Sequence, residues 1–254
     1  MFTYQGVKDT YTPQKWFSFM VLWILAVPMF PQIFMRFFTA KSSRALKNAA
    51  TVYPLVTAFL FLCPILIGVW GHTTFSGLDK AASDHILPMM LTEFAPLWLV
   101  TLAVIGGLAA FMSTMDSQLL ALSSIVTRDF YRGFWNEQVS SDRQVVVARI
   151  AVLILAGLGL LIAIKPPGTI LSIAVAAFSG LAVLFPTTIA VLYWKRVQAK
   201  ACITSIIVGE LLVFAFQLKW IPAAWALGFL PIIPIIFICT AIIYFGTMYF
   251  PQKD

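Results

Sequence analysis

The sequence predicts an all-α membrane protein with about seven transmembrane helices. Of its 254 residues, 61% are hydrophobic and only 11% are charged, and the mean hydropathy is +0.92. A soluble globular chain carries about 25% charged residues, whereas a helix that crosses a bilayer needs roughly 20 consecutive apolar residues. The composition therefore excludes an ordinary soluble enzyme and a nucleic-acid-binding protein, although the net charge is +7.

Seven apolar stretches are long enough to cross a membrane, and we treat residues 1–254 as a single transmembrane domain. The stretches cover residues 16–34, 49–70, 96–128, 145–164, 169–193, 201–218 and 225–250. The third is longer than one crossing needs, so we expect its last turns to project into water or to lie tilted. Between the second and third stretches, residues 83–92 are expected to form a short helix on the membrane surface.

Lysine and arginine residues indicate the orientation, because cytoplasmic loops are enriched in them. The odd-numbered connections and the C-terminus hold twelve of the 17 basic residues, namely Arg36, Lys41, Arg44, Lys47, Arg128, Arg132, Arg143, Arg149, Lys195, Arg196, Lys200 and Lys253. The N-terminus and the even-numbered connections hold five, namely Lys8, Lys15, Lys80, Lys165 and Lys219. We therefore expect a plasma-membrane protein with its N-terminus outside and its C-terminus in the cytoplasm. Contact of the basic residues with membrane lipid headgroups is a secondary expectation.

The first span contains two prolines, Pro28 and Pro31, within otherwise apolar sequence. Proline removes a backbone hydrogen bond, which membrane helices tolerate where they line a cavity. Broken helices of this kind are typical of secondary transporters. A simple proline kink that packs against a neighbouring helix is the alternative interpretation.

The third span carries a stripe of small and hydroxyl-bearing residues. By helical spacing its members are Gly106, Ala110, Ser113, Ser117 and Ser124, flanked by Thr114 and Asp116. Small residues let helices approach closely, and hydroxyl oxygens suit a hard cation such as sodium. The alternative is a packing face whose hydroxyl groups bond back to the helix backbone.

Two acidic residues, Asp116 and Glu210, lie well inside predicted spans. An ionisable side chain within a membrane is costly, so each is a functional candidate. Alternatively, Asp116 is protonated or held among polar partners, and Glu210 pairs with a polar group on a neighbouring helix. No nucleophile–base pair accompanies them, and His72 and His85 lack the spacing of metal ligands. The sequence predicts no catalytic site, no enzyme and no metal other than sodium.

Around the stripe of the third span, the sequence resembles the sodium:solute symporter family, which includes proline, pantothenate, iodide and sugar cotransporters. The first matching pattern is A-A-x-M-S-T-x-x-S-Q-L-L at residues 109–120, followed by Ser123–Ser124 and by D-x-Y at Asp129–Tyr131. The second is P-Q-x-x-x-R-F at Pro31–Phe37, where relatives often have histidine in place of Gln32. The third comprises KPPGTI, AAFSGL and LYWKRVQAKACITSIIVG, and it is most similar to pantothenate and proline permeases. Together these patterns cover nearly the whole chain.

The resemblance implies a LeuT-type fold, in which two inverted five-helix repeats hold a sodium site between them. Residues 16–193 would form the second repeat, and residues 201–250 would form two accessory helices. Relatives have about twelve or thirteen helices, so this chain matches roughly their C-terminal half. We expect the first repeat, which completes the sodium site, to be missing, and we interpret the chain as a fragment, a split-gene product or a truncated reading frame.

The resemblance also implies particular site residues. The backbone carbonyl of Ala110 and the side-chain oxygens of Ser113 and Thr114 correspond to sodium ligands. Asp116 and Ser117 are candidates for an ion-binding or polar network beside them. The broken first span resembles the unwound substrate helix of the family, so Trp23, Ala26 and Val27 are expected to face the solute.

The expected function is sodium-coupled symport of a small organic solute, such as pantothenate, proline or another carboxylate, by alternating access. Sodium is the coupling ion, and the missing N-terminal half, on the same or a separate chain, is an expected partner. Two alternatives remain, the first being a non-transporting assembly subunit that pairs with such a half. The second is a seven-helix receptor, which shares the expected topology but is disfavoured because residues 225–250 contain no lysine for a retinal Schiff base.

Overall fold

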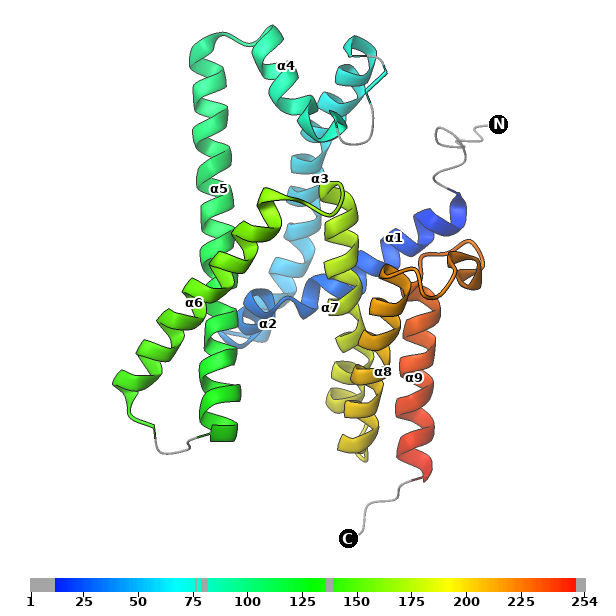
Figure 1. The fold of residues 1–254 in the computed structure, drawn as a ribbon. Helices are drawn as coiled ribbons and strands as arrows, with labels where there is room; N and C mark the ends of the chain where they lie inside the picture. Colours follow the sequence, from blue (N-terminus) through cyan, green and yellow to red (C-terminus); the bar gives the residue numbers. More distant parts are fainter. Residues whose placement is uncertain (1–11, 76, 79–81, 136–138, 250–254) are drawn as a thin grey trace. The chain divides into compact units, whose positions relative to one another are not determined.

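The computed structural model describes residues 12–75, 77–78, 82–135 and 139–249, and these residues form helices with no strand among them. The α-helices in Figure 1 are α1 Pro13–Ala26, α2 Pro31–Phe38, α3 Ser43–Thr74, α4 Ile86–Phe94, α5 Leu97–Ser124, α6 Ser141–Ile164, α7 Ile170–Tyr193, α8 Ala199–Gln217 and α9 Ile232–Tyr249. Short 3₁₀ segments cover Val27–Met29, Ala82–His85 and Ala223–Ala226, and a π-helix covers Ile125–Trp135.

The predicted all-α, multi-pass membrane architecture is confirmed. Six of the described helices are long and apolar enough to cross a membrane, and the bent pair α1–α2 raises the number to as many as seven. The two parts of this pair meet at an angle of 59°. The orientation in the membrane stays a prediction, and three residues that support it, Lys8, Lys80 and Lys253, lie outside the described residues.

Two of the predicted spans begin six and seven residues away from the predicted start. Helix α3 starts at Ser43, earlier than predicted, because the Ser42 side chain accepts a hydrogen bond from the Ala45 N–H at 3.2 Å and caps the helix. Helix α9 starts at Ile232, later than the predicted residue 225. Leu227 and Gly228 have φ values of 52° and 83°, a left-handed backbone that an α-helix cannot continue through.

The third predicted span is longer than one crossing needs, as expected, but it ends later than residue 128 and its end is not an ordinary α-helix. Helix α5 continues into the π-helix Ile125–Trp135, and the combined span Leu97–Phe134 has 38 residues. At the start of the π-helix, the buried Thr127 hydroxyl donates to the Ser123 carbonyl at 2.7 Å. The sequence predicted the extra length but not the change of helix type.

The expected short helix over residues 83–92 is present as α4 and the 3₁₀ turn before it. Helix α4 packs against α3, where a Cβ at Gly71 would lie only 2.8 Å from the Ile86 Cδ1 atom. Asp84, in the 3₁₀ turn, accepts a hydrogen bond from the Ile170 N–H at 3.0 Å and so satisfies the first amide of α7. The position of α4 on the membrane surface stays a prediction.

The chain divides into two compact units. The first unit comprises Met1–Phe34 and Leu171–Asp254, and the second comprises Met35–Ile170. The predicted division into a five-helix repeat over residues 16–193 and accessory helices over 201–250 follows different boundaries and stays a prediction.

The first unit has a close-packed apolar core. The core residues of α1, α7, α8 and α9 are Leu22, Ala26, Ala182, Val183, Val213, Ile232, Ile235 and Cys239. Gly209 of α8 lets three helices meet, because a Cβ at this position would lie 2.5 Å from the Val183 Cγ1 atom and 2.7 Å from the Cys239 Sγ atom. Small residues at helix contacts are the usual means by which membrane helices pack closely.

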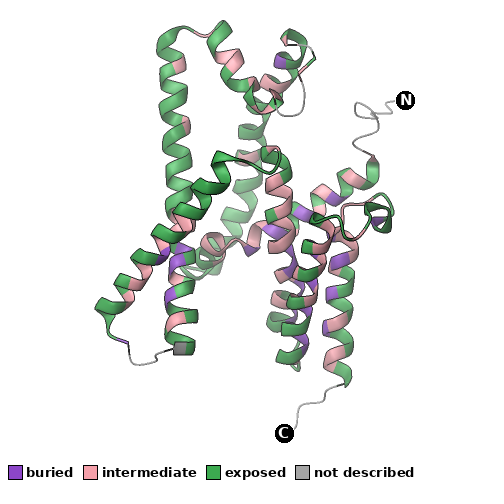
Figure 2. Cartoon of the chain, viewed as in Figure 1, coloured by how far each residue is buried: buried purple, intermediate pink, exposed green. Residues whose placement is uncertain are grey.

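The second unit is much more open, as the green ribbon of α3 and α5 in Figure 2 shows. In α3 and in the long third span, no residue of the most apolar stretch is buried. Buried residues gather where α6 crosses the lower half of α5, at Ala121, Ser123, Thr127 and Ala151. Most apolar side chains of this unit therefore face away from it, toward lipid or other segments of protein.

Candidate solute and sodium site

The first predicted span is broken in the structure, as its prolines suggested. Helix α1 ends at Ala26, Val27–Met29 form one 3₁₀ turn, and α2 restarts at Pro31. Pro28 and Pro31 have no N–H, so neither can donate the hydrogen bond that would continue α1. The turn is held instead by the Phe30 N–H, which donates to the Val27 carbonyl at 3.4 Å. Whether this break lines a cavity stays a prediction.

Helix α7 holds both sides of the break. The Phe178 ring lies edge-on to Trp23 before the break and to Phe30 after it, with ring centroids 4.6 and 5.1 Å apart. Further along α7, the Thr188 hydroxyl donates to the Met29 Sδ atom at 3.4 Å. Aromatic pairs in this edge-to-face geometry add stability beyond the area they bury. The broken helix is therefore fixed to α7 at two points.

The three residues expected to face the solute have different surroundings. Trp23 is 42% exposed beside Phe178, and Val27 is half-buried within the 3₁₀ turn. Ala26 is completely buried in the core of the first unit. Ala26 therefore contributes to packing in this structure, and a contact of any of the three with solute stays a prediction.

Sequence reasoning missed the aromatic contact around Phe178. The residue lies inside the AAFSGL segment that carried part of the family resemblance. Helical spacing cannot predict which of the 22 phenylalanines contacts a break that lies about 150 residues earlier in the chain. The available signal was the pairing of two prolines with flanking aromatics, Trp23 and Phe30.

The stripe on α5 brings two of the predicted sodium ligands together. The Thr114 hydroxyl donates to the Ala110 carbonyl, with the two oxygens 3.0 Å apart. The Ser117 hydroxyl in turn donates to the Thr114 carbonyl at 2.9 Å. Hydrogen bonds from a hydroxyl group to the backbone of its own helix are what the alternative interpretation, a packing face, predicts. The Ala110 carbonyl also accepts the helical hydrogen bond from the Thr114 N–H, so both of its lone pairs are used in this structure. The lone pairs of the Thr114 hydroxyl stay available to a cation.

The remaining candidates of this helix are spread around its surface. Ser113 precedes Thr114 by one residue, which rotates its side chain by about 100° around the helix axis. Ser113, Thr114 and Asp116 are exposed within the second unit, whereas Ser117 is half-buried. The Ala110–Ser117 group lies on the second unit and the Trp23–Val27 group on the first. A joint site for sodium and solute stays a prediction.

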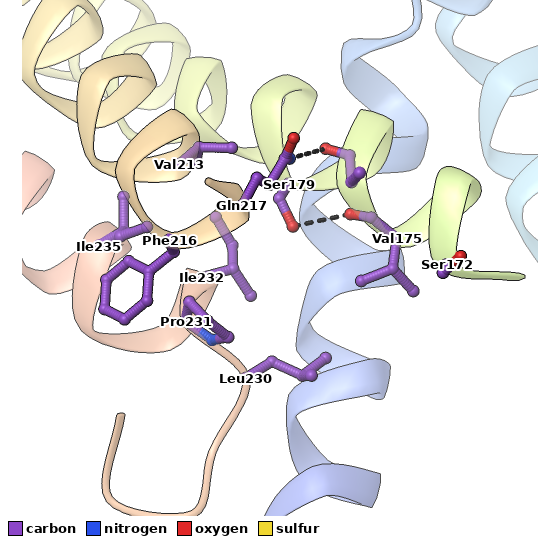
Figure 3. Close-up of a pocket in the computed structure, with 11 residues that line it drawn as sticks. Ser172, Val175, Ser179, Val213, Phe216, Gln217, Leu230, Pro231, Ile232 and Ile235 are labelled. Carbon is purple, nitrogen blue, oxygen red and sulfur yellow. Dashed lines mark hydrogen bonds between the residues drawn. The ribbon is translucent and has the colours of Figure 1, made fainter. Parts of the chain in front are cut away.

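A pocket of about 170 Å³ lies among α7, α8 and the start of α9 in the first unit (Figure 3). Of the polar side chains in its wall, Ser179 donates to the Val175 carbonyl at 2.7 Å and the Gln217 amide donates to the Ala176 carbonyl at 3.3 Å, so these two are bonded to α7. Apolar side chains such as Phe216 and Ile235 form most of the wall. No ionised side chain lines the pocket, so it offers a carboxylate no countercharge.

Glu210 of α8 lies against α7 rather than in an open cavity. A Cβ at Gly180 would lie 3.3 Å from the Glu210 Oε2 atom, so the carboxyl group packs closely against α7 at this glycine. Among the residues that the structure describes, none forms an ion pair or hydrogen bond with this half-buried carboxyl group. The alternative interpretation, in which Glu210 pairs with a polar group on a neighbouring helix, thus has no such partner in the described part of the chain.

The comparison with protein families gives one match, to the sodium:solute symporter family over residues 1–209. The matched region contains the broken first span, the stripe of α5 and helix α7. It therefore includes every residue that the sequence placed in the sodium or solute site.

Several curated relatives are transporters. The chain is 31% identical to the osmoregulated proline transporter OpuE of Bacillus subtilis (strain 168) over 200 residues, which are 77% of this chain and 40% of that protein. It is 29% identical to the sodium/pantothenate symporter of Escherichia coli (strain K12) over 234 residues, which are 91% of this chain and 47% of that protein. It is also 29% identical to the sodium/proline symporter of Haemophilus influenzae (strain ATCC 51907 / DSM 11121 / KW20 / Rd) over 198 residues, 74% of this chain and 38% of that protein.

The chain thus spans less than half the length of these curated relatives. No solved structure matches it.

Proposed function

Because the chain belongs to the sodium:solute symporter family, we propose that it forms part of a transporter that couples sodium entry to the uptake of a small organic solute. The family match over residues 1–209 is the observation that carries this proposal. Transport requires a membrane-spanning protein, and the helices that could span a membrane supply that. The chain is a transporter component and not an enzyme.

The sodium ligands in this proposal are the Ala110 carbonyl and the hydroxyl groups of Ser113 and Thr114. Support comes from the 3.0 Å separation of the Ala110 and Thr114 oxygens, which places two hard ligands side by side. Asp116 and Ser117 belong to the polar surroundings of the ion. Three oxygens are too few to coordinate a hard cation. Calcium, for example, takes about six to eight oxygen ligands. The rest of the coordination sphere comes from protein outside residues 97–124.

Coupling follows from a difference in affinity. Sodium can drive the solute inward only if the ion binds two conformations of the transporter with different affinity. The break in the first span supplies a place where backbone groups and the side chains of Trp23 and Val27 can contact a solute. Its attachment to α7 through Phe178 supplies a means to move the break and α7 together.

The proposed solute is a small carboxylated molecule of the proline or pantothenate type. Support comes from the printed names of the relatives, which are proline and pantothenate transporters. The proposed partner is an N-terminal half, on the same or a separate chain, because the relatives are more than twice as long as the matched region. In this proposal the N-terminus lies outside the plasma membrane and the C-terminus inside.

Uptake of labelled proline and pantothenate by cells that lack their own transporters tests this function. The chain is expressed alone and together with the unmatched N-terminal part of the Escherichia coli sodium/pantothenate symporter. We expect uptake with sodium, and not with potassium, only when both parts are present. Sodium-independent uptake, or no uptake in any arm despite both parts reaching the membrane, would contradict the proposal.

Three substitutions on α5 test the ion site within the same assay. Ser113→Ala and Thr114→Ala are expected to raise the sodium concentration for half-maximal uptake about tenfold, the effect of losing roughly 1.4 kcal/mol of binding energy. Thr101→Ala is the matched control. Thr101 is also exposed on α5, and its hydroxyl donates to the Leu97 carbonyl of the same helix at 2.8 Å. If Ser113→Ala and Thr114→Ala leave the sodium dependence unchanged, the ion site is misplaced.

A further inference from the structure

Two adjoining hollows lie between α5 and α6 in the second unit, and the transport proposal uses neither. The first has a volume of about 310 Å³, and its wall includes Ser124, Thr127, Arg128, Ser141 and Gln144. The second has a volume of about 470 Å³, and its wall includes Leu120, Arg149, Val152 and Leu153. Val145 and Ala148 line both hollows, so the two adjoin at α6.

The first hollow is suited to an anion. Arg128, at the start of the π-helix, contributes a guanidinium group, which is always charged and presents five donors in a fork that matches phosphate. Ser141 contributes a hydroxyl group at the first residue of α6. The positive end of the α6 dipole adds to this field, because the Ser140 side chain forms no capping bond to the first turn.

Other hydrogen bonds hold the wall of the polar hollow in place. Gln144 donates to the Val139 carbonyl at 3.1 Å, and Thr127 donates to the Ser123 carbonyl at 2.7 Å. Ser124 donates to the Leu120 carbonyl at 2.8 Å. Besides the second N–H of the Gln144 amide, Arg128 and Ser141 are the described side chains of the wall that have donors to offer a ligand.

The balance of charge around the hollow also favours an anion. On the π-helix and α6, the basic residues are Arg128, Arg132, Arg143 and Arg149, whereas the acidic residues of the described part are Asp129 and Asp142. Neither acidic residue lines the hollow. Among the described residues of the wall, an incoming phosphate therefore meets Arg128 without a carboxylate beside it.

The second hollow indicates where that phosphate comes from. Leu120, Val152 and Leu153 give it an apolar wall, and Val152 and Leu153 lie further into the apolar stretch of α6 than Ser141 does. A free phosphate ion gains nothing from an apolar groove, whereas a phospholipid places its headgroup and an acyl chain in adjoining polar and apolar sites. We propose that the double hollow between α5 and α6 binds an anionic phospholipid, with its phosphate at Arg128 and Ser141 and an acyl chain beside Val152.

Lipid binding to the purified 254-residue chain tests this proposal. Native mass spectrometry in detergent is used to titrate the chain with phosphatidylglycerol, phosphatidylcholine and, separately, inorganic phosphate. We expect the first bound phosphatidylglycerol to bind at least fivefold more tightly than phosphatidylcholine, and we expect no bound inorganic phosphate at the same concentrations. Equal binding of the two lipids, or binding of inorganic phosphate in place of lipid, would overturn the proposal.

Substitutions distinguish a specific lipid site from general attraction of anionic lipid to basic residues. Arg128→Gln is expected to remove the preference for phosphatidylglycerol, whereas Arg132→Gln, the matched control on the same π-helix, is expected to change it less than twofold. Ala148→Phe fills the part shared by the two hollows and is expected to lower lipid binding at least fivefold without changing the charge. Equal losses in Arg128→Gln and Arg132→Gln, or unchanged binding in Ala148→Phe, overturn the assignment. Circular dichroism and thermal unfolding in detergent verify that each variant is folded.

Discussion

The buried core of the first unit and the middle of α5 in the second unit use polar side chains in different ways. In the first unit, the buried Ser205 hydroxyl of α8 donates to the Cys239 carbonyl of α9 at 3.1 Å and so links two helices. In the second unit, Thr114 and Ser117 of α5 donate to carbonyl groups of their own helix, and Thr114 is exposed. Polar groups that join helices serve stability, whereas polar groups left open to their surroundings are available to a ligand. Ser205 therefore contributes to packing, whereas Thr114 and Ser117 belong to the proposed ion site.

The largest expected effect on stability is at a glycine of the packed unit. Gly209→Val places a Cβ against Val183 and Cys239, and overpacking of this kind costs about 3 kcal/mol. Thermal unfolding in detergent measures the loss. Gly106→Val on α5 is the matched control, because nothing lies within 4 Å of a Cβ there. Equal destabilisation by the two substitutions would show that the units do not differ in packing.

A smaller loss is expected from the aromatic contact at the broken helix. Phe178→Ala removes the ring that touches both Trp23 and Phe30, and we expect a cost of about 2 kcal/mol because the ring is only half-buried. Phe111→Ala on α5, where the ring is 69% exposed, is expected to change stability far less. Unfolding of the two variants, followed by circular dichroism, measures the difference. A larger loss in Phe111→Ala would contradict the assigned role of Phe178.

Ser205→Ala tests the hydrogen bond between α8 and α9. Interhelical hydrogen bonds in membrane proteins contribute about 0.6 kcal/mol on average and up to about 1.7, and we expect a value of about 1 kcal/mol because Ser205 is completely buried. Thr240→Ala on α9 is the control, since its exposed hydroxyl donates to the Ile236 carbonyl of the same helix. Chemical unfolding in mixed micelles gives both values. No difference between the two variants would contradict a stabilising link.

The smallest effect on stability is expected on α5. Thr114→Ala removes only a hydroxyl that bonds to its own helix, so the free energy of unfolding without sodium is expected to change by less than about 0.5 kcal/mol. The same unfolding assay measures this change. A loss as large as that of Ser205→Ala would mean that Thr114 has a packing role and would remove the contrast between the two units.

The parts of the fold that depend on composition and local chemistry could be predicted from the sequence. The helical membrane architecture follows from long apolar stretches, and the break at Pro28 and Pro31 follows from the missing N–H groups. The start of α9 could not be placed, because Trp225 is as apolar as the helix that follows and the left-handed turn at Leu227 has no signature in hydropathy.

The candidate site could be predicted only in part, for a different reason. The oxygens of Ala110 and Thr114 are four residues apart, so helical spacing alone brings them together. Phe178 meets Trp23 and Phe30 through tertiary packing, and the double hollow beside Arg128 depends on how α6 crosses α5. Contacts between helices distant in sequence have no period that a single sequence displays.

Equilibrium binding of radioactive sodium tests the central claim most directly. The chain is co-expressed with the N-terminal part of the Escherichia coli sodium/pantothenate symporter and compared with its Thr114→Ala, Ser205→Ala and Thr101→Ala variants. We predict that Thr114→Ala lowers the sodium affinity at least tenfold, while Ser205→Ala and Thr101→Ala stay within twofold of the unaltered chain. Equal sodium affinity in all four proteins would contradict the account, because α5 would then contribute no ligand to the ion.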